Sequence, residues 1–119
     1  MKHEIMWWMS RLTIMLTSLF LSFSLAAQAY AADITMGSNG NLVFEPNDLT
    51  INAGDTVTFT NGALPPHNMV VADHPELSHG DLAFAVGDSF DVTFTEAGDY
   101  NFQCDPHAGA GMKGVIHVK

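Results

Sequence analysis

The residues best suited to chemistry lie close together near the end of the chain. Cys104 is the only cysteine in 119 residues, and His107 and Met112 follow it on the same short stretch. His67 lies upstream, within Pro65-Pro66-His67-Asn68. A thiolate, two imidazoles and a thioether form the ligand set of a blue-copper electron-transfer site. These four residues therefore predict a metal centre whose reaction is the gain and loss of one electron.

The ligand types favour copper over zinc, the competing metal. Cys104, His107 and Met112 share one loop between two expected strands, and Gly109 and Gly111 permit its tight path. Soft sulfur ligands select copper(I), while imidazole accepts copper in both oxidation states. Structural zinc sites use Cys and His rather than Met. Each residue alone is more often a core or surface residue, so the prediction of copper rests on their conjunction.

The first third of the chain has the layout of a secretory signal peptide. Residues 1–11 are weakly basic, residues 12–27 are largely apolar, and Ala29-Tyr30-Ala31 supplies small residues before a cleavage site. We expect residues 1–31 to be removed and residues 32–119 to form a single copper-binding domain. An uncleaved membrane anchor is the alternative, because the apolar run approaches the ~20 residues that span a bilayer.

The net charge of the expected mature domain indicates which classes of partner it can bind. After cleavage, two lysines would remain against twelve acidic residues, a formal net charge of −10. This charge disfavours nucleic acid and anionic membranes, and it favours fast, salt-sensitive encounters with basic proteins. A lone cysteine excludes an internal disulfide, and a bound metal would protect that thiol in an oxidising compartment. We expect a monomer with no stable membrane insertion.

Short runs of β-type residues separated by turns predict an all-β fold. We expect strands near residues 33–36, 42–45, 49–52, 56–60, 68–71, 90–94, 100–104 and 115–118. Pro75-Glu76-Leu77 is expected to form one helical turn within residues 72–88, the least regular part of the chain. Seven or eight short strands at this spacing indicate an antiparallel β-sandwich.

Several segments resemble the plastocyanin family of cupredoxins, most closely its cyanobacterial and marine members. The likeness covers most of residues 33–119 and rests on Phe44-Glu45-Pro46, Ala53-Gly54-Asp55-Thr56-Val57, Pro65-Pro66-His67-Asn68, Leu77-Ser78-His79 and the stretch from Cys104 to Met112. It implies an eight-stranded antiparallel Greek-key β-sandwich (cupredoxin-like), with one copper ion at one end.

The resemblance also implies a function. It implies that the chain is not an enzyme but carries electrons from cytochrome f of the cytochrome b6f complex to photosystem I, in the thylakoid lumen. It places the copper ligands at His67, Cys104, His107 and Met112. It further implies that the backbone N–H of Asn68 bonds to the Cys104 sulfur and tunes the potential.

In this family the exposed edge of the second loop histidine, here His107, is the exit for the electron. We expect the surrounding apolar docking patch at Gly40, Leu42, Pro66 and Ala108, with ordinary loop packing as the alternative. A second set of residues forms either an acidic docking face or a solvated rim: Asp73, Glu76, Asp81, Asp88 and Asp91.

Two residues depart from the family pattern. Many members carry Tyr before the cysteine, where this chain has Gln103, so an aromatic docking site there is in doubt. Many cyanobacterial members carry Arg after the loop histidine, where this chain has Ala108. This substitution removes a positive contact beside the electron exit.

Three other functions compete with electron carriage between photosynthetic complexes. A multicopper or nitrite-reductase-like enzyme needs His-x-His pairs, and the sequence has none. A copper store or chaperone favours Met or Cys clusters, whereas residues 32–119 hold only Met36, Met69 and Met112. A pseudoazurin-like carrier shares the loop spacing, but pseudoazurins continue past the last strand into helices, and the last strand expected here adjoins Lys119.

Overall fold

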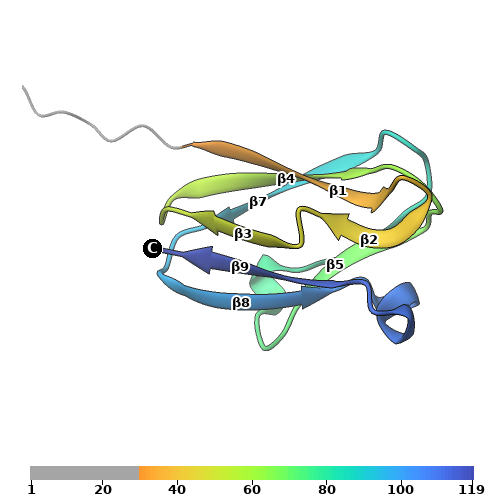
Figure 1. The fold of residues 1–119 in the computed structure, drawn as a ribbon. Coiled ribbons are helices and arrows are strands. Elements are labelled where there is room, and N and C mark those ends of the chain that lie inside the picture. Colours follow the sequence, from red (N-terminus) through yellow and green to blue (C-terminus); the bar gives the residue numbers. More distant parts are fainter. Residues whose placement is uncertain (1–29) are drawn as a thin grey trace, which may run out of the picture.

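The computed structural model describes residues 30–119, which form two β-sheets packed face to face (Figure 1). Apart from its last two positions, the signal peptide predicted over residues 1–31 lies outside the described residues. The strands are β1 (Ala31–Ser38), β2 (Asn41–Glu45), β3 (Asp48–Ile51), β4 (Asp55–Asn61), β5 (His67–Val71), β6 (His79–Ala83), β7 (Ser89–Phe94), β8 (Gly98–Gln103) and β9 (Lys113–Val118). Two short 3-10 helices are η2 (Pro75–Leu77) and η3 (Asp105–Ala110).

The described range contains no helix long and apolar enough to cross a membrane.

The two sheets have the strand orders β2-β1-β4-β7 and β3-β9-β8-β5-β6. The chain changes sheet between β2 and β3, which are separated only by Pro46 and Asn47. β1 pairs with β4, and β3 with β9, in parallel register, while the other pairings are antiparallel. The expected β-sandwich is confirmed, and the two parallel pairings are a feature that residue alternation could not reveal.

Alternating burial builds the core between the sheets. In β4, Val57 and Phe59 are buried while the threonines between them are partly exposed, as the period of two requires. Phe44, Phe59 and Phe102 meet edge to face, with ring centroids 4.7 to 6.5 Å apart. Because Phe102 comes two residues before Cys104 on the chain, this aromatic cluster fixes the strand that delivers the cysteine.

The strands expected from the sequence are present, and η2 forms at the predicted helical turn. One further strand, β6, lies in the segment that showed no periodicity. It is an edge strand with no buried residue, so its sequence carries no alternation of apolar and polar side chains. β6 therefore forms through its pairing with β5 rather than through its own pattern.

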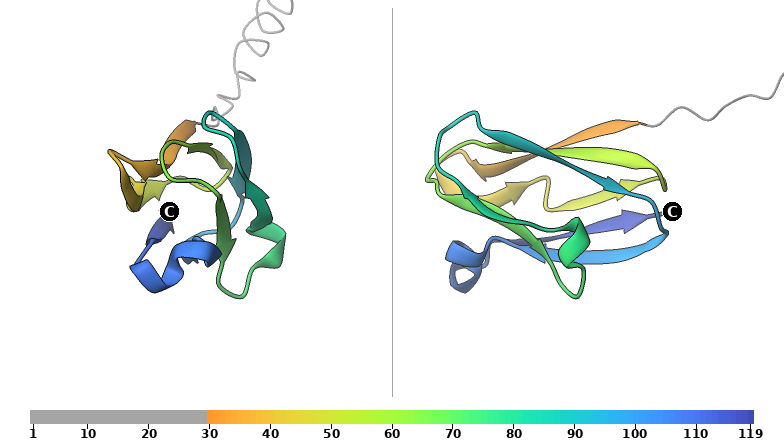
Figure 2. Two further views of the ribbon diagram at one scale, coloured as in Figure 1. Left: turned by 90° about the vertical axis from the view of Figure 1, so that its right-hand side faces the viewer. Right: turned by 180° about the vertical axis from the view of Figure 1, so that it is seen from behind.

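The connections that carry the predicted ligands gather at one end of the sandwich. Figures 1 and 2 place the β1–β2 turn, the β4–β5 and β6–β7 connections and η3 together, opposite the C-terminus. Segments far apart in sequence are thereby brought together at this end of the sandwich, which we call the rim.

At the other end of the second sheet, His117 joins three neighbouring strands. Its Nδ1 lies 2.7 Å from Asp99 Oδ1, and its Nε2 lies 3.2 Å from Asp48 Oδ1. The hydrogen bond with Asp99 is the main cause of a raised pKa for His117, and Asp48 raises this pKa further.

We expect His117→Gln to lower the thermal stability more in mildly acidic than in alkaline solution. Because the folded-state pKa is raised, stabilisation by the imidazolium is full below the unfolded-state value of about 6.5, provided that the carboxylates stay ionised. It disappears as the pH rises through the folded-state pKa. Thermal unfolding at roughly pH 5.5 and pH 9 measures the effect, and an equal loss of Tm at both values would contradict it.

Candidate metal centre

Three of the four predicted ligands bring their donor atoms together at the rim. One donor atom each from His67, Cys104 and His107 lies within 4.8 Å of the others. Cys104 Sγ is 3.7 Å from His67 Nδ1 and 3.5 Å from His107 Nδ1, and the two imidazole centroids are 5.1 Å apart. His67 and Cys104 are fully buried, while His107 is only partly buried. The cluster therefore faces the solvent through a single imidazole.

The loop after β8 is closed by its own backbone. The N–H of Cys104 donates to the carbonyl of Met112 at 3.1 Å, and the N–H of Met112 donates to the carbonyl of His107 at 3.2 Å. Gly111 ends η3 with a φ of 87°, a left-handed conformation that suits glycine. Met112 is fully buried beside this closed loop. The loop thus positions the thiol, the second imidazole and the thioether as one unit.

The ring of His67 is oriented by a backbone carbonyl. His67 Nε2 lies 2.6 Å from the oxygen of Ala63, so Nε2 carries the proton and donates it to that carbonyl. Nδ1 is then the unprotonated nitrogen, and this is the atom that faces Cys104. The hydrogen bond selects the tautomer that a metal requires before any metal binds.

Gly37 provides the space for this arrangement. It has a φ of 78°, and a Cβ built on it would lie 1.9 Å from the Ala63 oxygen and 2.7 Å from His67 Nε2. Any other residue would therefore displace the hydrogen bond between His67 and Ala63. The sequence showed only a turn-like Gly-Ser-Asn-Gly at this position, so the contact with His67 could not be foreseen.

The side chain of Asn68 ties the two ligand-bearing segments together. Its Oδ1 accepts the backbone N–H of Asp105 at 2.8 Å, directly after Cys104. Its Nδ2 donates to the carbonyl of Gly80 in β6 at 3.0 Å. Asn68 is almost fully buried, and both ends of its amide are satisfied. It therefore locks the cysteine loop to the strand that begins at His67.

Two opposing effects act on the pKa of the Cys104 thiol. Burial raises the pKa of Cys104, while hydrogen bonds from the backbone N–H groups of Asn68 and His107 lower it. Burial also lowers the pKa of His107, and the neighbouring His67 lowers it further. The site thus favours neutral imidazole, the form that binds metal, and a bound cation would favour the thiolate.

The donor separations fit a first-row metal ion. Metal bonds of about 2.3 Å to sulfur and about 2.0 Å to nitrogen, meeting at about 120°, separate the two donor atoms by about 3.7 Å. The observed sulfur–nitrogen distances of 3.7 and 3.5 Å match this separation. A thiolate with two imidazoles and a nearby thioether is a donor set that copper prefers.

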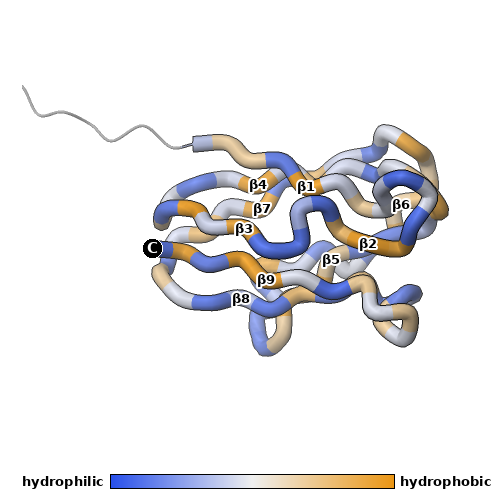
Figure 3. Tube along the Cα trace, in the orientation of Figure 1, coloured by the Kyte–Doolittle hydropathy of each residue, from blue (hydrophilic) through white to orange (hydrophobic). Residues whose placement is uncertain are grey.

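Three of the four residues predicted for the apolar docking patch are only partly exposed. Gly40 is exposed, whereas Leu42, Pro66 and Ala108 are half-buried, and Leu42 packs against the core. The structure adds large apolar side chains that sequence reasoning missed. Three exposed ones lie on the connections at this end, Leu64, Phe84 and Val86, and a fourth, Leu82, lies in β6 just before one of these connections. Figure 3 shows apolar residues in the connection that follows β6.

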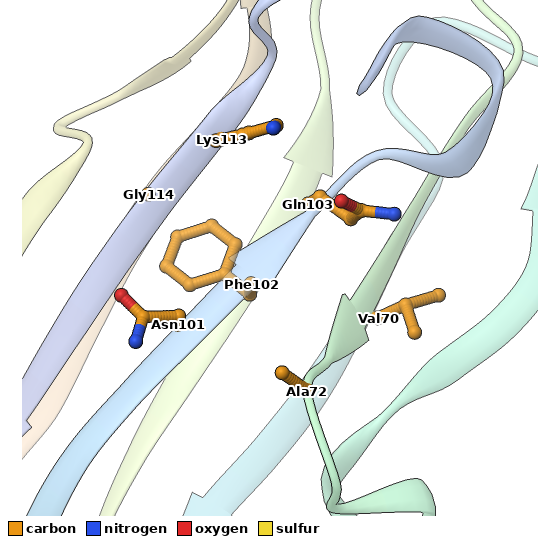
Figure 4. Close-up of a pocket in the computed structure, with 7 residues that line it drawn as sticks. All are labelled: Val70, Ala72, Asn101, Phe102, Gln103, Lys113 and Gly114. Atoms are coloured by element: carbon orange, nitrogen blue, oxygen red, sulfur yellow. The ribbon is translucent and has the colours of Figure 1, made fainter. Parts of the chain in front are cut away.

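Gln103 lies on a pocket of about 440 Å³ on the second sheet (Figure 4). The lining residues come from β8 and β9 and from β5 with the residue that follows it: Val70, Ala72, Asn101, Phe102, Gln103, Lys113 and Gly114. The Gln103 amide donates to Asp105 Oδ1 at 3.1 Å, so this position supports the loop beside the cysteine. None of the three clustered donor residues lines this pocket.

A two-sheet β-sandwich with a Cys-His-His donor set at one end, two donors buried and one partly exposed, defines a copper-binding electron-transfer protein. Comparison with known families agrees, because residues 31–119 match the family described as copper binding proteins, plastocyanin/azurin family. The chain belongs to this family. It is a blue-copper electron carrier, not an enzyme.

Individual relatives point the same way. The chain is 45% identical over 103 residues to the chloroplastic plastocyanin of Hordeum vulgare, covering 79% of this chain and 66% of that protein. It is 45% identical over 98 residues to the plastocyanin of Scenedesmus fuscus, covering 73% of this chain and 100% of that protein. The oxidised plastocyanin of Dryopteris crassirhizoma superimposes with a TM-score of 0.66 at 33% identity, covering 74% of this chain and 100% of that one.

We expect Gly37→Ala to weaken copper binding and to lower the stability by about 1–3 kcal/mol, because the new Cβ collides with the Ala63 carbonyl and the His67 ring. Gly40→Ala is the matched control, since Gly40 has a similar φ of 73° but open space around it. Copper-loss rates and thermal unfolding measure the difference. Equal effects of the two substitutions would show that the contact with His67 is unimportant.

Proposed function

We propose that this protein carries single electrons from cytochrome f to photosystem I in the thylakoid lumen, as a monomer with one copper ion. The observation that carries the proposal is the contrast in burial: His67 and Cys104 are sealed from water, and His107 alone among the clustered donors reaches the surface. Relatives named chloroplastic plastocyanin support the location.

We propose His67, Cys104, His107 and Met112 as the copper ligands. Copper, when bound, supplies the one-electron couple. The Ala63 carbonyl holds His67, and Asn68 and the closed loop hold Cys104, so these donors stay in place when the charge of the site changes. Burial of the thiol excludes water and oxidants from it.

The apolar residues around His107 are suited to transient docking. Gly40, Leu42, Pro66 and Ala108 form the patch expected from the sequence, and Leu64 extends it beside Pro66. In a protein with so many acidic residues, such a patch fits a partner with an apolar centre and a basic surround. The five acidic residues proposed for a docking face are all exposed, though Glu76 also pairs with His74 and Asp91 with Thr58.

Leu64 combines an unusual backbone conformation with an exposed apolar side chain. It is a non-glycine residue with a φ of 56°, and its side chain is 51% exposed. A left-handed conformation costs a leucine roughly 1–2 kcal/mol, and exposure of its side chain returns none of this energy. Strain that folding does not require is typical of functional positions. We therefore assign Leu64 to partner contact.

The ligand assignment predicts an intense blue colour when Cu(II) is added to the wild-type protein, lost on reduction. Cys104→Ser should abolish this colour, because it replaces the thiolate by a hydroxyl. Circular dichroism of the variant should still show the β-sandwich, since the aromatic cluster of Phe44, Phe59 and Phe102 is unchanged. A blue Cys104→Ser variant would overturn the assignment.

The proposed partner is tested by stopped-flow oxidation of the reduced protein by photosystem I particles across ionic strength. We expect fast transfer whose rate falls as salt screens the acidic surface. No transfer to photosystem I would contradict the proposal and favour a pseudoazurin-like carrier.

Leu64→Gly should slow this transfer about fivefold, if docking buries enough apolar surface to contribute about 1 kcal/mol. The same change should raise the thermal stability, because glycine relieves the strained φ. Asn39→Gly is the control, since Asn39 also has a positive φ of 53° but presents no apolar side chain. An unchanged transfer rate for Leu64→Gly would remove this residue from the docking patch.

A further inference from the structure

A buried carboxylate holds the start of the folded domain. Asp55 is only 4% exposed, at the turn where β3 leads into β4. Its Oδ2 accepts the backbone N–H of Asn52 at 2.8 Å, which closes the turn. Its Oδ1 accepts the backbone N–H of Tyr30 at 2.9 Å. One carboxylate oxygen thus closes the turn, and the other binds the backbone of Tyr30, which lies at the edge of the predicted leader.

The backbone of Tyr30 makes hydrogen bonds in both directions. Its side chain is 68% exposed, but its carbonyl accepts the N–H of Thr56 at 3.1 Å. The parallel pairing of β1 with β4 continues from this contact, with Ala31 beside Thr56. The sheet therefore uses Tyr30 and Ala31, although both fall before the cleavage position expected after Ala31.

The leader contains two overlapping pairs of small residues. Ala27-Gln28-Ala29 satisfies the small-x-small pattern for cleavage before Tyr30, and Ala29-Tyr30-Ala31 satisfies it for cleavage before Ala32. The two cleavage positions leave Asp55 with different hydrogen-bond partners. Cleavage before Ala32 removes the Tyr30 donor and leaves Asp55 Oδ1 without that partner. It also deprives the N–H of Thr56 of its acceptor.

We propose that the leader is removed between Ala29 and Tyr30, and that Asp55 receives the new α-ammonium group of Tyr30. A signal peptidase would hydrolyse this peptide bond with one water molecule, leaving the carboxylate on Ala29 and the amine on Tyr30. The hydrogen bond from a neutral N–H to the Asp55 carboxylate then becomes a hydrogen-bonded ion pair between two charged groups, which is a stronger interaction. The inference rests on the signal peptide proposed from the sequence, and it is independent of the copper function.

The direct test is the intact mass of the full chain after export with its own leader. We expect a mature protein that begins at Tyr30. A protein that begins at Ala32 would overturn the inference. The same sample is loaded with copper and assayed with photosystem I, so an error in the start site is distinguishable from an error in the proposed function.

Two leader variants make the test sharper. Ala31→Leu blocks only cleavage before Ala32, so the mature chain should still begin at Tyr30; loss of processing would contradict the inference. Ala27→Leu blocks only cleavage before Tyr30 and should shift the start to Ala32. The shifted protein should unfold about 5 °C lower, because Asp55 loses its partner. An unchanged Tm would show that Asp55 does not depend on Tyr30.

Discussion

The metal centre depends on the side-chain amide of Asn68. The two buried donors lie at the ends of neighbouring strands, because His67 begins β5 and Cys104 directly follows β8, which pairs with β5. This pairing brings the two donors together, and a cross-link at the strand ends fixes their separation. Asn68 supplies it by accepting the N–H of Asp105 while donating to Gly80. Because the amide is buried, loss of either partner would leave an unsatisfied polar group. The cross-link is therefore stable as long as the sandwich is folded.

Apart from that side-chain cross-link, the donors are positioned by backbone groups. The Ala63 carbonyl selects the tautomer of His67, and the carbonyls of Met112 and His107 close the cysteine loop. Backbone groups belong to the sheets and their connecting turns, so they move little when the charge of the site changes. A centre built in this way suits electron transfer, where any rearrangement of ligands slows the reaction.

Much of this could be predicted from the sequence. The strands with alternating apolar residues, the sandwich class, the donor set and the copper chemistry all follow from local patterns and residue types. The strand β6 could not be predicted, because an exposed edge strand has no alternation. The contact of Gly37 with His67, the cross-link by Asn68 and the role of Asp55 were also hidden, since each joins residues that are distant in sequence. Leu64 could not be identified from the sequence, because its positive φ and its exposed side chain are properties of the fold.

The fold should hold the donor atoms in place whichever charge the metal carries. X-ray absorption at the copper edge tests it most directly, on the oxidised and the reduced protein. We expect the same shell of one short sulfur and two nitrogen ligands in both states, with little change in bond length. Loss of a nitrogen or sulfur ligand, or an added oxygen ligand, in either state would contradict it.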